Sequence, residues 1–292
     1  MNILICGASG FIGSVLCAWL EQRGHRVVKG VRRAVNTNEI AIDFTTDVEP
    51  DRWRARLNGI DAVINAVGIL VERGHQTFDA VHTRGPIALF EACRQEGVKR
   101  VIQISALGAQ AGDTPYFKSK VAADTYLQRS PVSYQIVRPA LVYGPSGASA
   151  RFFRMLASLP VHFLPAGGRQ LLRPVHADDL AELVARLIEV DVADRQSIDV
   201  VGAEQVEYRE MLAVYRRSLG LAPALRVSIP AGVINAGAVL LDRVPGSMLT
   251  RDTWRMLQAG NTGDVAQTSA ILGRRPLGIR EFIGRDAAPL RK

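Results

Sequence analysis

The chain has 292 residues, enough to bury one large hydrophobic core or two small ones. Hydrophobic residues make up 48% of it and charged residues 22%, a balance typical of a globular enzyme and unlike that of a disordered chain. The net charge is +8, but the arginines are scattered and only 6% of the residues are aromatic. We therefore expect no nucleic-acid partner, because such a protein needs a basic stripe interleaved with aromatic side chains.

Residues 1–33 predict a strand, a glycine turn, a helix and a second strand. An apolar run at 3–6 leads into the sequence GASGFIG, and the following segment carries Leu16 and Leu20 on one helical face. A second apolar strand spans 26–31. This βαβ unit favours a dinucleotide-binding protein, although an ordinary strand-to-helix loop would show a similar glycine pattern.

The glycines of the turn have separate physical roles. Gly7 makes the sharp turn, Gly10 leaves room for a pyrophosphate at the helix N-terminus, and Gly13 lets the helix lie close to the sheet. The residues expected to bind the cofactor here are Gly7, Ser9, Gly10, Phe11, Ile12 and Gly13.

The end of the second strand indicates which dinucleotide is preferred. A carboxylate about 20 residues after the glycines would bind a ribose 2′-hydroxyl, whereas arginine accommodates a 2′-phosphate. The strand ends in Arg32 and Arg33, and no acid follows before Glu39. These residues favour NADP(H), with NAD(H) as the second choice, while a solvated basic turn is the structural alternative.

Strand and helix patterns continue to alternate along the chain. The expected strands are 39–44, 61–68, 98–105 and 134–137, and the expected helices are 52–57, 78–96 and 116–128. We expect Arg138 and Pro139 to end the last of these strands, because proline has no N–H for the ladder. The alternation predicts an α/β protein with a Rossmann-type, doubly wound parallel sheet.

The composition changes after Gly144 and Pro145, where short segments are separated by proline and glycine. We expect a dinucleotide-binding domain at 1–145, to which 174–201 returns, and a smaller, mostly helical substrate region at 146–173 and 202–292. Asp178 and Asp179 are expected to cap a helix that ends near residue 189, and 197–201 to form a seventh strand.

Two further features of the sequence bear on the location of the protein in the cell. The three cysteines, Cys6, Cys17 and Cys93, have no metal or redox spacing and are expected to be small buried residues. The apolar run 227–241 is too short to span a bilayer and reads as a buried helix, with a lid or membrane-facing helix as the alternative. We expect no signal peptide and a cytoplasmic protein, with peripheral association on the cytoplasmic side of a membrane complex as the alternative.

Tyr116 and Lys120 form the pair most relevant to catalysis. Residues four apart share a helix face, so the Lys120 ammonium is expected near the Tyr116 hydroxyl, where it would lower the phenol's pKa. Such a phenol can exchange a proton with a carbonyl or alcohol while a nicotinamide exchanges a hydride. The same spacing also occurs by chance on many helices.

Together with the glycine turn, these residues resemble the short-chain dehydrogenase/reductase superfamily, in its extended or atypical, epimerase/dehydratase-like branch. The resemblance covers most of the chain. It implies cofactor contacts by Lys120 and by the segments Asp43-Phe44, Ala66-Val67-Gly68 and the one that contains Pro139.

A narrower resemblance, carried by Val81-His82-Thr83, by 104–109 and by 249–252, is to the group related to the NADPH-binding accessory subunit of respiratory complex I. Members of that group bind NADPH without necessarily turning over a substrate. The chain also departs from the catalytic pattern of epimerases, because Ala106 and Leu107 stand where a Ser or Thr hydroxyl is usual. Ser105 is the local substitute.

Two functions remain. The first is an NADPH-dependent oxidoreductase acting on a small carbonyl, alcohol or quinone-related substrate, with Tyr116, Lys120 and Ser105 as catalytic residues. The second is a non-catalytic NADPH-binding module of a respiratory or quinone-linked complex. His75 and His82 follow the fourth expected strand, but a lone histidine is more often structural than catalytic. No cluster has metal-ligand spacing, so no metal site is expected.

Overall fold

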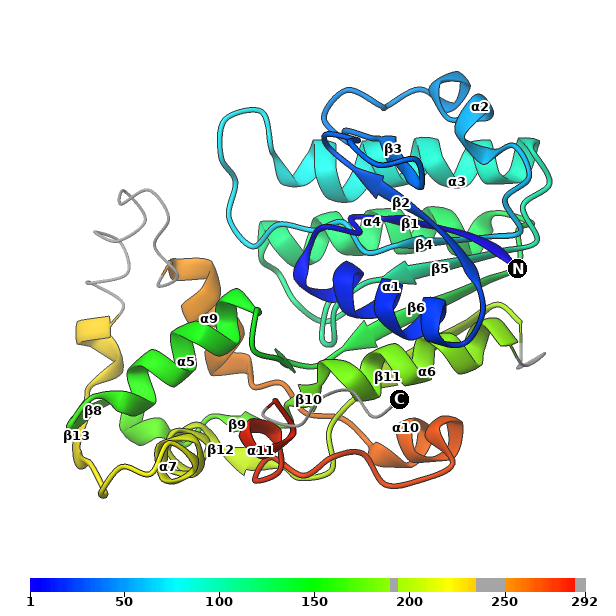
Figure 1. The fold of residues 1–292 in the computed structure, drawn as a ribbon. Helices are drawn as coiled ribbons and strands as arrows, with labels where there is room; N and C mark the ends of the chain where they lie inside the picture. Colours follow the sequence, from blue (N-terminus) through cyan, green and yellow to red (C-terminus); the bar gives the residue numbers. More distant parts are fainter. Residues whose placement is uncertain (190–193, 235–249, 287–292) are drawn as a thin grey trace. The chain divides into compact units, whose positions relative to one another are not determined.

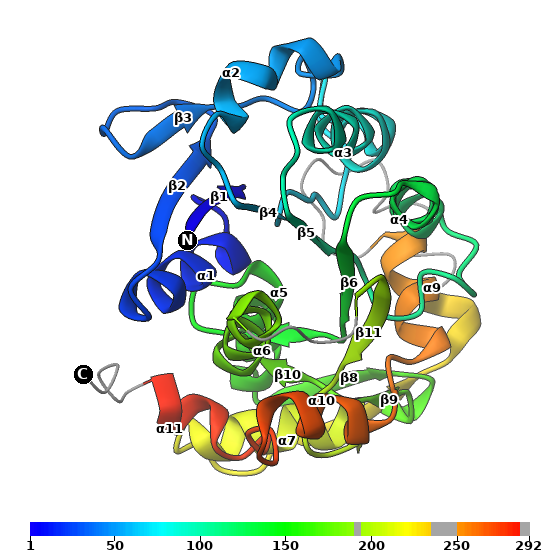
Figure 2. The ribbon, with the colours of Figure 1, turned by 90° about the vertical axis from the view of Figure 1, so that its right-hand side faces the viewer.

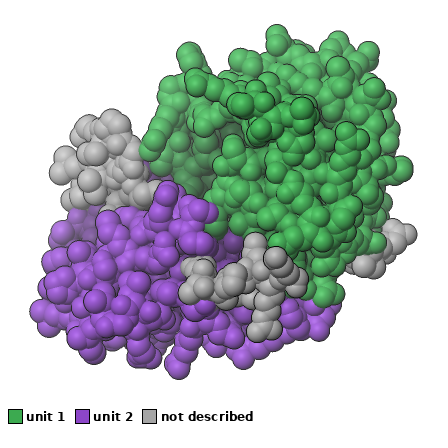
Figure 3. All heavy atoms as spheres, in the orientation of Figure 1, with its two compact units in different colours: residues 1–139, 180–199 green, residues 140–179, 200–292 purple. Residues whose placement is uncertain are grey.

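The computed structural model describes residues 1–189, 194–234 and 250–286. The chain forms two compact units, coloured separately in Figure 3. Unit 1 comprises Met1–Pro139 and Leu180–Asp199, and unit 2 comprises Ala140–Asp179 and Val200–Lys292. Each unit has its own core, and the chain passes from unit 1 to unit 2 and back before it ends in unit 2.

Unit 1 is built on a seven-stranded sheet with the strand order β11-β6-β5-β4-β1-β2-β3. Every neighbouring pair from β6 to β3 is parallel. The strands are β1 (Asn2–Cys6), β2 (Arg26–Val31), β3 (Glu39–Ala41), β4 (Ala62–Asn65), β5 (Arg100–Ile104), β6 (Tyr134–Pro139) and β11 (Gln196–Val200). The expected doubly wound Rossmann-type sheet is therefore confirmed.

Helices cover both faces of this sheet (Figures 1 and 2). Helix α1 (Phe11–Gln22) lies on one face, and α3 (Gly85–Gln95) and α4 (Pro115–Arg129) lie on the other. The core between the sheet and helices α3 and α4 includes Leu4, Val63 and Phe90, all fully buried. The short helices η1 (Pro50–Arg52) and α2 (Arg54–Leu57) replace the single helix expected at 52–57.

The order of the strands creates a switch point between β1 and β4. From β1 the chain continues to β2 on one side, whereas β4 pairs with the other side of β1. At such a point the loops after the two strands diverge and leave a crevice at their carboxyl ends. In this chain the glycine turn after β1 and the segment after β4 both lie at this point, and a Cβ on Gly7 would be 3.1 Å from the Ala66 backbone.

Two expected strands differ from the structure for local reasons. The strand expected at 39–44 ends at Ala41, because the Asp43 Oδ1 atom accepts hydrogen bonds from the Thr45 N–H and hydroxyl and forms a turn. Strand β6 continues through Pro139, which was expected to stop it. The Pro139 carbonyl accepts the Leu107 N–H at 3.0 Å, so the missing proline N–H costs this pairing nothing.

The helix expected at 78–96 is divided. It begins with the π-helical turn η2 (Asp79–Arg84) and continues as α3 from Gly85. Pro86 cannot donate a hydrogen bond to the preceding turn, and a wider turn relieves that defect. Gly85 is required as well, because a Cβ there would lie 2.8 Å from the Phe44 Cβ atom.

The part of unit 2 that the structure describes contains three two-stranded sheets and several helices. Its core is formed around Tyr143, Tyr215 and Phe282. The strand pairs are β7 (Val142–Tyr143) with β10 (Val175–His176), β9 (Leu171–Leu172) with β12 (Val206–Glu207), and β8 (Val161–Pro165) with β13 (Leu225–Ile229). Among the described residues its helices include α5 (Ala148–Ser158), η3 (Ala166–Gly168), α7 (Tyr208–Ser218), α9 (Arg251–Ala259), α10 (Val265–Leu272) and α11 (Phe282–Asp286), while α6 (Ala177–Glu189) runs from unit 2 into unit 1.

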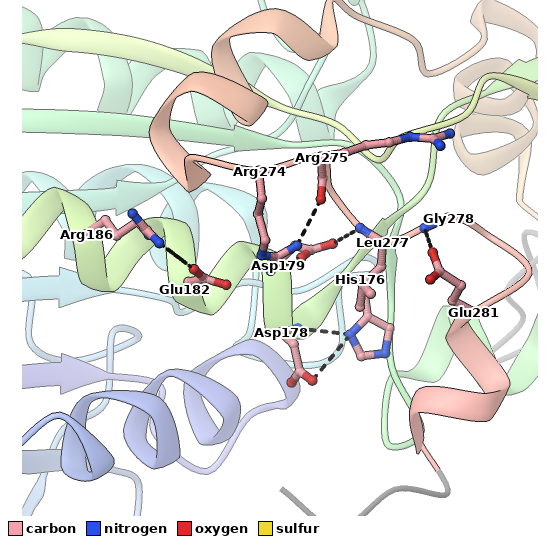
Figure 4. A network of polar contacts seen from close by, with 10 residues as sticks. All are labelled: His176, Asp178, Asp179, Glu182, Arg186, Arg274, Arg275, Leu277, Gly278 and Glu281. Carbon is pink, nitrogen blue, oxygen red and sulfur yellow. Dashed lines mark hydrogen bonds and ion pairs between the residues drawn. The ribbon is translucent and has the colours of Figure 1, made fainter. Parts of the chain in front are cut away.

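The two aspartates at the start of α6 do not cap it, contrary to the prediction from the sequence. The helix begins at Ala177, so Asp178 and Asp179 lie within its first turn. Asp179 is fully buried and accepts hydrogen bonds from Arg274 Nη2 at 2.6 Å and from the Leu277 N–H at 2.7 Å (Figure 4). It therefore fixes the segment after α10 instead of satisfying the helix end.

The apolar run 227–241 is only partly described. Residues up to Ile229 belong to β13, so the first part of the run is a strand and not the helix that was expected. Residues 231–234 are helical, and 235–241 lie outside the described residues. Among the described residues, no helix is long and apolar enough to cross a membrane. Cys6, Cys17 and Cys93 are free and buried, as predicted.

Candidate functional site

The glycine turn after β1 is held by backbone contacts. The N–H groups of Gly7 and Ala8 donate to the Gly30 carbonyl of β2 at 3.0 and 3.1 Å. Gly7 has φ +83°, and a Cβ on it would lie 3.1 Å from the backbone of Ala66. Both the left-handed conformation and the close approach require glycine, which confirms the turn expected at Gly7.

Gly10 and Gly13 differ in what surrounds them. Gly10 is exposed and precedes α1, whose N-terminus has no side-chain cap and no acidic residue in its first turn. The first N–H groups of the helix, at Phe11 and Ile12, are thus open to an anion. A Cβ on Gly13 would lie 2.1 Å from the Gly7 carbonyl oxygen, so Gly13 lets α1 approach the turn itself.

Arg32 and Arg33 follow directly after β2 and are both exposed. Neither side chain has a hydrogen-bond or ion-pair partner among the residues that the structure describes, so both are available to a ligand. Asp43 and Phe44, the adenine contacts implied by the family resemblance, lie after β3. The Asp43 carboxylate binds Thr45, and the Phe44 ring is buried against Trp53 at a centroid distance of 5.4 Å.

The segment after β4 is anchored from several sides. Asn65 is buried, donates to Gln103 Oε1 at 2.8 Å and accepts the Val67 N–H at 3.1 Å. The Ala66 N–H donates to the Cys6 carbonyl at 3.0 Å. Gly68 is close to α4 as well, because a Cβ there would lie 3.3 Å from Lys120 Nζ.

Tyr116 and Lys120 lie in the first half of α4, which begins after the capping residue Thr114. Lys120 is buried, its Nζ donates to the Ile104 carbonyl at 3.1 Å, and burial lowers its pKa to about 8. Tyr116 packs edge-on against Phe78 and His82. Burial raises the pKa of Tyr116 to about 12, so the lowered pKa expected from the Tyr-Lys spacing is not found.

Ser105 is oriented by a residue that the sequence analysis missed. Its hydroxyl donates to Asp124 Oδ2 at 2.6 Å, and both side chains are buried. Arg138 Nε lies 4.0 Å from the same oxygen. Burial raises the pKa of Asp124, while the Ser105 hydrogen bond and the charges of Lys120 and Arg138 oppose the rise.

A sequence signal for Asp124 existed. It lies four residues after Lys120 and eight after Tyr116, so all three share one face of α4. Ala106 and Leu107 are buried and carry no hydroxyl that could replace the usual catalytic one. We call Tyr116, Lys120, Asp124 and Ser105 the α4 cluster.

His82 has a structural role, as expected of a lone histidine. Its Nε2 atom accepts the Ile69 N–H at 3.0 Å, so the neutral ring carries its proton on Nδ1 and donates it to Ser119 Oγ, also at 3.0 Å. Burial and the nearby Lys120 charge lower its pKa to about 2. The ring therefore stays neutral and links the β4 exit to α4, whereas His75 is exposed.

Among the described residues, no group of three His, Cys, Asp or Glu side chains is arranged to hold a metal ion.

Comparisons with known proteins agree with this geometry. Residues 3–202 match the NAD dependent epimerase/dehydratase family. The chain is 26% identical over 245 residues to a ceramide reductase of Caulobacter vibrioides (strain NA1000 / CB15N), covering 82% of this chain and 77% of that protein. It is 27% identical over 291 residues to the uncharacterized protein Rv2047c of Mycobacterium tuberculosis (strain ATCC 25618 / H37Rv), covering 97% of this chain but only 31% of that protein.

Among solved structures, the human epimerase family protein SDR39U1 (isoform2) with NADPH has a TM-score of 0.74 to this chain at 20% identity, covering 98% of this chain and 99% of that one. At this identity the likeness concerns the fold.

A parallel sheet with a glycine turn at its switch point and a Tyr-Lys pair beside it defines an extended short-chain dehydrogenase/reductase. More specifically, the chain belongs to the NAD dependent epimerase/dehydratase family, as the sequence motifs indicated. It is thus an oxidoreductase-like protein of this superfamily.

Proposed function

We propose that the protein is an NADPH-dependent oxidoreductase that reduces a small carbonyl or quinone-related substrate. The preference for NADPH rests on the end of β2. Arg32 and Arg33 are exposed there and have no partners among the described residues. Two forked donors suit a 2′-phosphate, and no carboxylate stands there to accept a hydrogen bond from a 2′-hydroxyl.

The residues of the crevice fit a dinucleotide. Gly10 leaves space before α1, and the uncapped N–H groups of the helix can receive a pyrophosphate. Lys120 Nζ lies beside Gly68, in position to contact a ribose hydroxyl. Ala66, Val67 and Pro139 would line the crevice. When bound, the nicotinamide supplies the hydride.

Tyr116 is the proton donor in this proposal. With a pKa of about 12 its hydroxyl is protonated at neutral pH, the state that a reductase needs in its acid. Lys120, with a pKa of about 8, is mostly charged at pH 7, but its charge does not offset the effect of burial on the Tyr116 phenol. Ser105 already donates to Asp124, so its oxygen can only accept a further hydrogen bond, and we assign it a positioning role.

The second candidate is a non-catalytic NADPH-binding module of a respiratory or quinone-linked complex, peripheral to a membrane. It is favoured by Ala106 and Leu107, which lack the usual hydroxyl, and by the engagement of Ser105 with Asp124. This candidate keeps the same cofactor contacts but gives Tyr116 no chemical role.

The two candidates are separated by a turnover assay. NADPH absorbance is followed with a panel of aldehydes, ketones and quinones, for the wild type and for Tyr116→Phe. We expect the variant to bind NADPH with nearly unchanged affinity and to lose at least about a hundredfold in turnover, because general acid catalysis contributes about 10²–10⁴-fold. The packing control is Phe117→Leu, which alters the adjacent buried side chain and leaves the phenol in place.

Equal turnover by Tyr116→Phe and the wild type would remove Tyr116 as the acid. Binding of NADPH without turnover on any substrate class would favour the module.

A further inference from the structure

A groove that the proposed function does not use runs along α7 in unit 2. It consists of two adjoining hollows of about 520 Å³ and about 300 Å³, and Ala213, Arg217 and Arg226 line both of them. Every residue that lines either hollow belongs to unit 2. We call this feature the α7 groove.

The α7 groove combines an apolar lining with basic side chains. Val206, Val214 and Ile279 line the larger hollow, and Leu221, Pro223 and Ala224 line the smaller one. On α7, residues 210, 213, 214 and 217 are spaced three and four apart, so one helix face supplies both the apolar and the charged contacts. The arginines shared by the two hollows stand between the two apolar linings.

In the α7 groove the carboxylates have hydrogen-bond partners, whereas three of the arginines have none among the described residues. Arg217, Arg226 and Arg280 are exposed and have no side-chain partner among the described residues. The two carboxylates of the larger hollow do have partners, since Glu204 Oε1 binds Arg275 Nη2 at 3.2 Å and Glu210 Oε2 accepts the Glu207 N–H at 3.1 Å. Three guanidinium groups thus line the groove with their donors unused.

One wall of the smaller hollow is rigid. Arg216 is buried, and its Nη1 atom donates to the carbonyls of Ala157, Ser158 and Leu159 at 2.8–3.1 Å. These contacts join the end of α5 to α7, and they engage the Arg216 guanidinium within the protein. The neighbouring Arg217 is therefore the one of this pair that is available to a ligand.

We propose that the α7 groove binds an organic phosphate. The phosphate oxygens lie between Arg217 and Arg226, whose planar forks match them, and Arg280 adds a third positive charge. The organic part of the ligand covers Val206, Val214 and Ile279 and gains by removing apolar surface from water. A compact inorganic anion would leave this apolar lining unused, so the geometry selects an amphipathic ligand.

The test uses hexyl phosphate as the probe and isothermal titration calorimetry as the readout. Hexyl phosphate is expected to bind one site saturably, and inorganic phosphate and hexanol to bind at least about tenfold more weakly, because each provides only half of the contacts. The double variant Arg217→Gln/Arg226→Gln should lower the affinity for hexyl phosphate at least about tenfold. Arg151→Gln, at an exposed arginine on α5, makes a comparable charge change and should leave the affinity unchanged.

Two further arms locate the binding. Backbone amide signals of Ala213 and Val214 should shift on addition of hexyl phosphate. The affinity should be the same in Arg32→Ala, which separates this site from the phosphate contact proposed after β2. The double variant should keep the wild-type affinity for NADPH, so failure of this inference leaves the proposed function untouched.

Several outcomes would overturn the inference. They are the absence of saturable binding, an unchanged affinity in a correctly folded double variant, hexanol binding as tightly as hexyl phosphate, and loss of binding in Arg32→Ala. Equal affinity for hexanoate would overturn the assignment to a phosphate.

Discussion

The glycine turn and the α4 cluster are assembled in different ways. The turn is made of backbone: Gly7 contacts Gly30 and Ala66, and Gly13 contacts Gly7. The α4 cluster is made of buried side chains from α4 and the end of β5, with Arg138 of β6 close to Asp124. A backbone site is defined by where a side chain is forbidden, whereas a side-chain cluster depends on partners that are distant in the sequence.

The largest effect is expected when the α4 cluster loses its carboxylate. Asp124→Ala leaves the buried Arg138 without its nearby counter-charge and Ser105 without its acceptor. Removing one partner of a buried pair typically costs about 3–5 kcal/mol in the free energy of unfolding. Denaturant unfolding measures it, and Asp113→Ala, at an exposed position, should stay within about 0.5 kcal/mol of the wild type. A small change in Asp124→Ala would mean that the cluster is not held together by this charge.

Gly10→Val breaks the glycine turn as a binding site without breaking the fold. A Cβ at this exposed position would meet only the Gly7 carbonyl oxygen, at 3.1 Å. The valine would block the approach of a pyrophosphate to α1, and NADPH affinity should fall at least about a hundredfold with the loss of charge-assisted contacts. Fluorescence titration measures the affinity, and thermal unfolding the fold.

Gly13→Ala is the matched control, since its Cβ would lie 2.1 Å from the Gly7 carbonyl. This variant should lose about 1–3 kcal/mol of stability through overpacking. If Gly10→Val bound NADPH like the wild type, the turn would be merely structural.

Arg32→Ala tests which cofactor the glycine-turn site prefers. The loss of one charge-assisted bond to the 2′-phosphate should cost about 1.5–3 kcal/mol, or roughly ten- to a hundredfold in NADPH affinity, while NADH affinity stays the same. Parallel titrations of both cofactors measure the difference, and Arg26→Ala, at the exposed start of β2, is the charge control. Equal affinities of the wild type for NADH and NADPH would disprove the preference.

The effect at His82 is absent at neutral pH and appears only at acid pH. Its pKa is about 2 in the folded protein but near 6.5 in the unfolded chain, so the unfolded state binds the extra proton between these values. Stability should therefore fall as the pH drops below 6.5, by up to about 1.4 kcal/mol per pH unit from this residue.

In His82→Gln that part of the slope should disappear, because an amide can accept from Ile69 and donate to Ser119 without taking up a proton. Chemical unfolding between about pH 6.5 and pH 4.5, the range below the ordinary histidine pKa, measures the slope. His75→Gln, at an exposed position, should leave it unchanged, and an equally steep slope in His82→Gln would assign the acid sensitivity elsewhere.

The sheet and the glycine turn could be predicted from the sequence because both follow from local rules. Apolar runs of strand length alternate with amphipathic segments, and a glycine such as Gly7 marks a conformation that other residues avoid. The boundaries were less predictable. The turn at Asp43 and the π-helical turn before Gly85 arise from single side chains and from one proline, which periodicity does not register.

Only part of the α4 cluster could be predicted from the sequence. The spacing of Tyr116 and Lys120 placed them on one face of α4, but the pKa of Tyr116 depends on burial, which the spacing does not measure. The spacing also places Asp124 on this face of α4, but its hydrogen bond with Ser105 depends on how the end of β5 packs against the helix, which the spacing does not show. Asp179 was mistaken for a cap because its partners, Arg274 and Leu277, lie almost a hundred residues later.

The interrupted course of the chain through unit 1 affects how the protein emerges from the ribosome. Strand β6 ends at Pro139, but its neighbour β11 begins only at Gln196, after the first segment of unit 2 has been made. At about 5–20 residues per second, this edge of the nascent sheet stays unpaired for roughly 3–12 s. An open strand edge is a template for pairing with other chains, so during these seconds the buried residues of β6 lie at an edge that β11 later occupies.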